Sequence, residues 1–377
     1  MLRSYLRDQN RIFGLDLMRA AAILMVLFGH CAWIYPEDGG IISQLMALCG
    51  YLGVEVFFVL SGYLIGGILL KMFLKDAFTA QSVLYFLRRR WFRTLPNYFL
   101  ILLVNIGIAA WLGYHIEGLW KYFLFLQNFA HPLLPFFPES WSLSIEEFAY
   151  VILPLSLLPA GLMVTPRSKS SVFIVVVIVL STLCLSAKLL YHLDMGTTTL
   201  VQWNLALKSV VIYRLDAIFY GVICAWIHFH FRQTWERWRI PAFLTGGALL
   251  GFFTIGVGAL GLFIDRYPFF WNVLYLPVTS ISIACFLPVL SQMRKAGPAL
   301  AYPITFVSLV SYSVYLLHYS VVLQALKHLV DTDSLSSMGR HAFSAGYIVL
   351  TFILSVILYR FFERPVMDLR DARPISR

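Results

Sequence analysis

Ten apolar segments, each about as long as a bilayer is thick, constrain this chain more than any other feature. A transmembrane helix needs about 20 consecutive, mainly apolar residues, and a helix satisfies its own backbone hydrogen bonds in lipid. Of the 377 residues, 60% are hydrophobic and 13% are charged, too few charges to cover a soluble protein of this size. The sequence therefore predicts an all-α polytopic membrane protein with about ten transmembrane helices. The segments are residues 12–34, 41–70, 92–112, 142–164, 172–193, 209–231, 242–264, 269–291, 303–326 and 342–362.

The basic residues predict how these helices are oriented. If the amino terminus is cytoplasmic, most of the 29 Lys and Arg residues fall on inner connections and few on outer ones. An excess of positive charge on the cytoplasmic side is the usual pattern in membrane proteins. We therefore expect a multi-pass membrane protein with both termini in the cytoplasm. The net charge of +10 then reflects topology and contact with membrane lipid, and we expect no nucleic-acid partner.

The connections between the apolar segments are short. We therefore expect residues 1–377 to form a single transmembrane domain with no appended soluble domain. The longest outer connection, residues 113–141, carries aromatic residues and prolines, and we expect it to lie on or dip into the membrane interface as a lid. The five cysteines are scattered without CxxC spacing, which predicts reduced packing residues rather than a disulfide or a metal site.

Three ionisable residues interrupt the first apolar segment: Asp16, Arg19 and His30. Each such side chain costs roughly 2.5–3.5 kcal/mol to insert, so these residues usually face a protein interior or a wet cavity. The step from Arg19 to His30 returns to nearly the same face of a helix, about 16 Å further along. Asp16 is close enough to pair with Arg19. One polar stripe of this helix is therefore expected to face inward.

Other apolar segments contain ionisable residues too, among them Glu55 and Glu147. Those expected at mid-depth or in the outer half of their helices are His30, Glu146, Arg214, Asp216 and His318. One shared cavity explains these costly groups more simply than independent positions do. A structural network of ion pairs would give the same sequence pattern.

A basic cluster precedes the third apolar segment: Arg88, Arg89, Arg90 and Arg93, with Trp91 and Phe92 between them. Guanidinium groups and aromatic rings in this arrangement suit a phosphorylated ligand with a base that can stack. A stop-transfer cluster bound to anionic lipid has the same composition. Composition alone favours the lipid interpretation.

The chain resembles the integral-membrane acyltransferase family 3 from about Gly14 to Asp368. The resemblance rests on blocks in the order of the family, each of them weak when taken alone. They are Arg19 and His30 with ten residues between them, FFVLSGYLIG at 57–66, RRWFRTLP at 89–96, WSLSIEE at 141–147, RLDAIFYG at 214–221, SYSVYLLH at 311–318 and FERP at 362–365. One departure is Ala149, which stands where the family usually has an aromatic residue. Many members also append an SGNH hydrolase-like domain, which we do not expect here.

The resemblance implies a membrane-bound O-acyltransferase of the cytoplasmic (inner) membrane. Such an enzyme moves an acyl group, most often acetyl, from acyl-coenzyme A to a hydroxyl of a cell-surface glycan or glycolipid. It also implies site residues: His30 as the general base, Glu146 as the carboxylate that orients it, and Arg90 and Arg93 as ligands of the coenzyme A phosphates. A histidine suits this role because its unperturbed pKa lies near working pH. No metal is implied.

Several of the remaining candidates carry two interpretations. Arg19 is expected to contact the donor or to neutralise Asp16. The residues expected to line the substrate cavity are Ser61, Tyr63, Glu147, Arg214, Asp216, Tyr312 and His318. Close packing of small residues is the alternative at Ser61 and Gly62, and a structural hydrogen bond is the alternative at Tyr312 and His318. Glu363 is expected to form a local salt bridge at the end of the last helix.

Two other classes of protein would fit the same composition. A secondary transporter also has many helices and buried charges, but the chain has no repeated half with matching broken helices. A non-enzymatic sensor or scaffold would use the buried charges for packing alone. The transporter predicts flux without a covalent product, and the scaffold predicts that His30 matters through stability alone.

Overall fold

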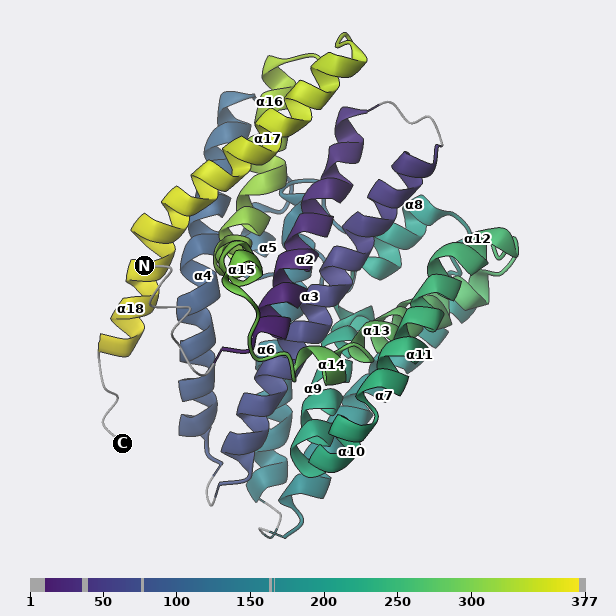
Figure 1. The fold of residues 1–377 in the computed structure, drawn as a ribbon, viewed down its shortest axis with the longest axis vertical. Helices are drawn as coiled ribbons and strands as arrows, with labels where there is room; N and C mark the ends of the chain where they lie inside the picture. Colours follow the sequence, from purple (N-terminus) through teal and green to yellow (C-terminus); the bar gives the residue numbers. More distant parts are fainter. Residues whose placement is uncertain (1–10, 36–39, 76–77, 163–164, 166, 373–377) are drawn as a thin grey trace.

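The computed structural model describes residues 11–35, 40–75, 78–162, 165 and 167–372. Every regular element within these residues is a helix, and the helices form an elongated bundle (Figure 1). Nine of the described helices are long and apolar enough to cross a membrane, and a further apolar helix, α9 (Leu215–His230), is shorter. These findings confirm the predicted all-α polytopic architecture. The nine are Phe13–Ile34, Ile41–Phe73, Ala80–Trp111, Pro138–Gly161, Lys169–Asp194, Arg239–Ala259, Phe270–Leu290, Pro298–Leu329 and Ser337–Arg370.

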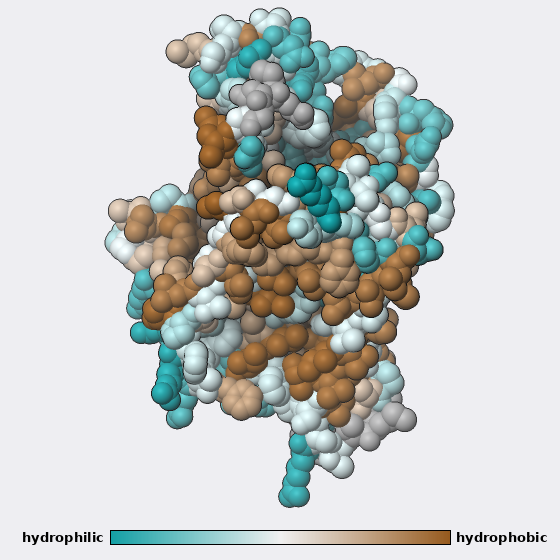
Figure 2. All heavy atoms as spheres, turned by 90° about the vertical axis from the view of Figure 1, so that its right-hand side faces the viewer, coloured by the Kyte–Doolittle hydropathy of each residue, from teal (hydrophilic) through white to brown (hydrophobic). Residues whose placement is uncertain are grey.

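The orientation of the bundle in the membrane stays a prediction. Residues 1–10 and 373–377, which bear on the expected cytoplasmic termini, lie outside the described part of the chain. The outer faces of peripheral helices are apolar, as lipid contact requires. Val175 and Leu183 of α7 (Lys169–Asp194) and Ile353 of α17 (Ser337–Leu358) are more than half exposed. Figure 2 shows hydrophobic side chains across the middle of one face and hydrophilic ones toward its upper and lower ends.

Helix α3 (Ile41–Phe73) packs against both α2 (Phe13–His30) and α9, and both contacts run through glycine. A Cβ on Gly53 would lie 2.6 Å from the carbonyl oxygen of Ala22 in α2. A Cβ on Gly62 would lie 1.8 Å from the carbonyl oxygen of Ile218 in α9. The backbones therefore touch directly, which small residues allow between membrane helices. This contact favours the packing interpretation at Gly62.

Two connecting segments fold against each other. One is the predicted lid, which contains α5 (Leu119–Phe123) and the short turn η2 (Pro138–Ser140); the other runs from α8 (Leu200–Trp203) to the start of α9. The N–H of Val211 donates to the carbonyl of Asn128 at 2.9 Å, and the N–H of Ile212 donates to that of Phe129 at 3.2 Å. Asn128 is fully buried. The centre of the predicted lid is therefore part of the packed bundle.

Candidate active site

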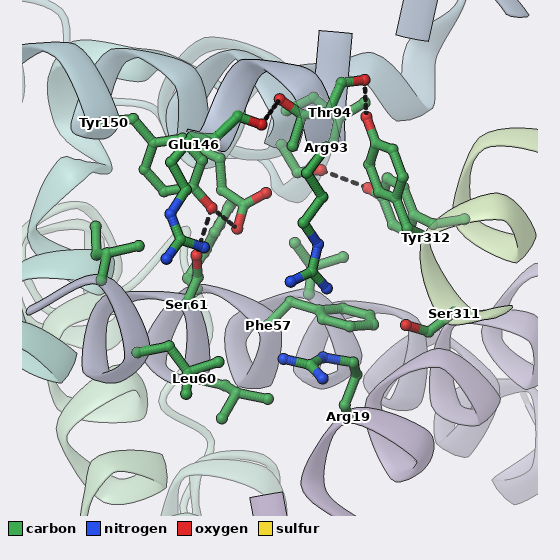
Figure 3. Close-up of a pocket in the computed structure, with 18 residues that line it drawn as sticks. Arg19, Phe57, Leu60, Ser61, Arg93, Thr94, Glu146, Tyr150, Ser311 and Tyr312 are labelled. Atoms are coloured by element: carbon green, nitrogen blue, oxygen red, sulfur yellow. Dashed lines mark hydrogen bonds between the residues drawn. The ribbon is translucent and has the colours of Figure 1, made fainter. Parts of the chain in front are cut away.

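A cavity opens among five helices: α2, α3, α4 (Ala80–Trp111), α6 (Trp141–Leu162) and α15 (Pro298–Leu317). It contains about 820 Å³ of space free of atoms, including solvent at its mouth. Figure 3 shows side chains from these helices converging on the same space.

Three guanidinium groups and one carboxylate line this cavity among the described residues. Arg90 and Arg93 reach it from α4, Arg19 reaches it from α2, and Glu146 reaches it from α6. In Figure 3, the side chains of Arg19 and Arg93 approach the space beside Phe57 from opposite sides. The lining thus carries an excess of positive charge. A cationic cavity with forked donors favours an anionic ligand such as a phosphate.

Glu146 is held by a chain of hydrogen bonds across the cavity. The hydroxyl of Tyr150 donates to Oε1 of Glu146 at 3.0 Å and lies 2.8 Å from Oγ of Ser61. Because the Tyr150 proton goes to the carboxylate, the Ser61 hydroxyl donates to Tyr150. Ser61 therefore lies in the cavity, where the sequence analysis expected it. Tyr150 was missed as a site residue, although its position one helical turn after Glu146 could have indicated it.

Arg19 shares the carboxylate of Asp16 with Arg11. Arg11 donates to Asp16 at 2.9 and 2.6 Å, whereas Nη1 of Arg19 lies 3.8 Å from Oδ1 of Asp16. The hydroxyl of Ser308 donates to the same oxygen at 2.8 Å, and Nη1 of Arg19 donates to Ser308 at 3.5 Å. Asp16 therefore positions the side chain of Arg19, and the negative charge of Asp16 is shared by Arg19 and Arg11. The side chain of Arg19 still lines the cavity.

His30 lies at the carboxyl end of α2, beyond the cavity lining. Its Nδ1 is 2.8 Å from the carbonyl oxygen of Val26. A carbonyl oxygen only accepts, so the neutral ring carries its proton on Nδ1 and keeps a lone pair on Nε2. The ring of His30 meets that of His318 edge to face, with centroids 4.5 Å apart, and lies 5.0 Å from the ring of Tyr319.

His318 has the same tautomer for the same reason. Its Nδ1 is 2.7 Å from the carbonyl oxygen of Tyr315, and its Nε2 is buried without a hydrogen-bond partner among the described residues. The ring of Tyr315 lies 5.5 Å from that of His318 and also lines the cavity. Tyr315 exchanges a hydrogen bond of 2.6 Å with Ser142, another lining residue. Tyr315 therefore connects the cavity to the two histidines, which the sequence analysis did not anticipate.

The structure does not bring Glu146 and His30 together as expected. The hydrogen bond of Glu146 comes from Tyr150, inside the cavity. The hydrogen bond of His30 goes to Val26, on its own helix. The group that fixes the His30 tautomer is therefore a backbone carbonyl, which corrects the predicted carboxylate–histidine pair.

Arg214 and Asp216 also differ from the prediction, since neither lines the cavity. Arg214 pairs with Glu55 of α3, and Asp216 pairs with Lys188 of α7; all four side chains are fully buried. The hydroxyl of Ser280 donates to the second oxygen of Glu55 at 2.8 Å. These charges form the ion-pair network that the sequence analysis weighed as the alternative to one shared cavity.

Two more predicted cavity residues point elsewhere. The hydroxyl of Tyr63 lies 2.5 Å from Nδ1 of His228 in α9. Glu147 accepts a hydrogen bond of 2.6 Å from Oγ1 of Thr94 and is not among the lining residues. Neighbouring residues of a helix lie about 100° apart, so Glu147 faces α4 while Glu146 faces the cavity. Tyr312 does line the cavity, and its hydroxyl donates to the carbonyl of Thr94 at 2.8 Å.

Apolar helices surround a cationic cavity, and an imidazole pair lies next to one of its walls. A family model described as an acyltransferase domain matches residues 12–360, and the chain belongs to this acyltransferase family.

Curated proteins similar to this chain have names that agree with the family. "Putative peptidoglycan O-acetyltransferase YrhL" of Bacillus subtilis (strain 168) is 25% identical over 378 residues, which cover 94% of this chain and 54% of that protein. "Putative O-acetyltransferase SACOL0978" of Staphylococcus aureus (strain COL) is 24% identical, with 95% and 58% covered. "O-acetyltransferase OatA" of Staphylococcus aureus (strain NCTC 8325 / PS 47) is 22% identical, with 94% and 57% covered. The chain thus spans about half the length of these relatives. No solved structure matches it.

Proposed function

We propose that this protein transfers an acyl group, acetyl in the first instance, from acyl-coenzyme A to a hydroxyl of a cell-surface glycan or glycolipid. The observation that carries the proposal is the convergence of Arg19, Arg90 and Arg93 on one cavity with a single lining carboxylate among the described residues. Such a cavity suits the phosphates of coenzyme A, because planar guanidinium groups bind phosphate with two parallel hydrogen bonds. Membership of the acyltransferase family agrees with this chemistry.

The donor is bound, in this proposal, by the arginines of two helices. Arg90 and Arg93 of α4 hold the phosphates, and Arg19 meets the donor at the wall that α2 contributes. Glu146 faces the arginines, and Tyr150 fixes its carboxylate. Its role is to orient the guanidinium groups and limit their mutual repulsion. This role differs from orientation of the imidazole, because the hydrogen bond of His30 goes elsewhere.

His30 acts as the general base. Its Nδ1 is committed to the Val26 carbonyl, so Nε2 has the lone pair that accepts a proton from the acceptor hydroxyl. The hydroxyl oxygen bonds to the carbonyl carbon of the thioester, and the carbon–sulfur bond breaks. The proton on Nε2 then passes to the departing thiolate. Arg19 and His30 are about 16 Å apart along α2, so an extended donor arm connects the two sites.

The two ends of the site face opposite sides of the membrane in the proposed topology. The arginine cluster of α4 lies toward the cytoplasm, where acyl-coenzyme A is made, and His30 lies toward the outer side. The protein is then a multi-pass enzyme of the cytoplasmic membrane that receives its donor from one side and its acceptor from the other. Because similar proteins are named peptidoglycan or O-acetyltransferases, a peptidoglycan glycan is the first acceptor to test.

The experiment uses purified protein in liposomes with acetyl-coenzyme A labelled in its acetyl group and peptidoglycan oligosaccharides as acceptor. We expect the wild type to release coenzyme A and label the glycan, and His30→Gln to lose this transfer while keeping its melting temperature. His341→Gln is the matched control, because His341 lies on the surface and pairs with Tyr35. A wild type that neither releases coenzyme A nor moves label would overturn the proposed function. A fully active His30→Gln would overturn the base assignment alone.

A further inference from the structure

Lys208 is a cation that the proposed function has not used. It ends the short π-helical turn η3 (Asn204–Lys208), between α8 and α9. Its ammonium lies 5.4 Å from the centre of the Trp141 ring and 5.9 Å from that of Tyr51. Aromatic faces attract a cation, and the attraction grows when water is excluded.

The charges around Lys208 leave it without a counter-ion. The charged groups that act on it most strongly are Glu55 and Arg214, and these two pair with each other. The next carboxylate along the chain, Asp216, pairs with Lys188. Among the described residues, no carboxylate lies within ion-pair distance of Lys208. The cluster therefore carries one surplus positive charge, which is costly in a protein interior unless an anion forms or binds beside it.

Asn128 fixes the position of this cation. Its side-chain amide donates to the carbonyl of Trp141 at 3.0 Å and to the carbonyl of Ser209 at 2.6 Å. The fully buried side chain of Asn128 thus links Ser209, which follows Lys208, to Trp141, whose ring faces the ammonium. Such a fixed arrangement is what a preorganised electrostatic site requires.

Lys208 also lies beside one wall of the cavity. Trp141, which faces the ammonium, precedes Ser142 in the cavity lining. Its ring packs against that of Phe58, another lining residue, with centroids 5.7 Å apart. The charge of Lys208 also acts on the imidazole of His30. The cation therefore lies behind one wall of the cavity, within electrostatic range of the proposed general base.

We propose that Lys208 stabilises the negative charge that develops on the carbonyl oxygen of the acyl group during transfer. This inference rests on the proposed function. When the acceptor oxygen bonds to the carbonyl carbon, the electron pair of the C=O bond moves to oxygen, and the hydroxyl proton goes to Nε2 of His30. The ammonium faces that oxygen until the pair returns and the carbon–sulfur bond breaks. Lys208 itself neither gains nor loses a proton.

The test compares Lys208→Met, Lys208→Arg and Lys121→Met in the liposome assay with acetyl-coenzyme A and peptidoglycan oligosaccharides. In other enzymes, removing one donor that stabilises an oxyanion lowers kcat by about 100- to 1,000-fold. We expect that loss for Lys208→Met with little change in KM for either substrate, and partial recovery for Lys208→Arg. Lys121 is the control, because it is also a lysine of the connecting segments but pairs with His131.

A second readout separates this role from a structural one. Replacing this half-buried cation, which has no ion-pair partner among the described residues, by methionine of similar shape removes a desolvation cost, so we expect the melting temperature of Lys208→Met to stay or rise. Unchanged kcat in Lys208→Met, or a loss confined to acceptor KM, would overturn the inference while leaving the proposed function intact. A lower melting temperature that accounts for the lost activity would also overturn it. A wild type without transfer would overturn the proposed function and, with it, this inference.

Discussion

The imidazole rings of His30 and His318 meet edge to face, 4.5 Å between centroids, and each ring donates its Nδ1 proton to a backbone carbonyl of its own helix. Both rings are thereby fixed in orientation, and the Nε2 atom of each ring keeps its basic lone pair. His318 begins a π-helical stretch, η7 (His318–Leu323), and such stretches are frequent at functional sites. His318 is therefore a positioning residue for His30 in the proposed reaction.

Replacing His318 by leucine removes this contact. An aromatic pair contributes about 0.5–1.5 kcal/mol beyond its buried area, so kcat should fall by about 2- to 12-fold. The KM for the donor should not change, because His318 is not among the residues that line the arginine cavity. Steady-state kinetics of His318→Leu and His318→Phe measure the effect, and we expect the phenylalanine variant, which keeps an aromatic ring, to retain more activity. Equal losses in both variants would contradict a packing contribution.

The arginines of α4 give a prediction about donor binding. A hydrogen bond to a charged group contributes about 1.5–3 kcal/mol, so Arg90→Ala and Arg93→Ala should each raise the KM for acetyl-coenzyme A by about 10- to 150-fold. Arg89→Ala is the control, since Arg89 is exposed and does not line the cavity. If all three variants behave alike, the cluster binds lipid rather than the donor.

The buried pair of Glu55 and Arg214 gives a prediction about stability. Removing one member leaves a charge without its partner and costs about 3–5 kcal/mol. Glu55→Leu and Arg214→Met should therefore each lower the melting temperature in detergent strongly. The double variant should recover much of that loss, because neither member of the pair is left without its partner. Additive losses in the double variant would show that the two side chains do not depend on each other.

The contact between α3 and α9 can be tested with two glycines of one helix. A Cβ at Gly62 would overlap the carbonyl of Ile218, whereas a Cβ at Gly67 would meet nothing within 4 Å. Overpacking costs about 1–3 kcal/mol or more, so Gly62→Ala should destabilise the protein. Gly67→Ala should be neutral or stabilise it by up to about 1 kcal/mol, because alanine favours a helix. Thermal melts of both variants provide the comparison.

The pH dependence of kcat offers a check on Lys208. Burial lowers the pKa of Lys208 to about 8. Tyr51, Glu55, Arg214 and His30 are the ionisable groups around it. As pH rises through about 8, the ammonium loses its charge and kcat of the wild type should fall. Lys208→Arg should keep its remaining kcat at higher pH, because a guanidinium stays protonated. A wild-type kcat that is flat from pH 7 to 10 would contradict this assignment.

Hydropathy alone predicted about ten membrane helices and their order along the chain, because each must supply about 20 apolar residues to cross a bilayer. Among the described residues, nine helices meet that length and α9 is shorter. The predicted segment 209–231 was less accurate at its start. Residues 209–214 contain only the short 3-10 turn η4 (Val211–Tyr213), and the α-helix begins at Leu215. The cause is a tertiary contact that no local pattern reveals, since Asn128 binds the carbonyl of Ser209 and pairs with the backbone of Val211.

By itself, the sequence determined that the chain is a bundle of membrane helices, that polar residues lie inside them, and that its motifs resemble those of an acyltransferase family. These properties depend on composition and spacing along the chain. The tertiary structure alone decided which polar residues share a site. Glu146 faces Arg19, Arg90 and Arg93, whereas Arg214 meets Glu55 in a separate, closed pair. The reason is geometric, because the direction in which a side chain points depends on the rotation of its helix and on partners far along the chain. Residues that look equivalent in sequence therefore lie in different environments.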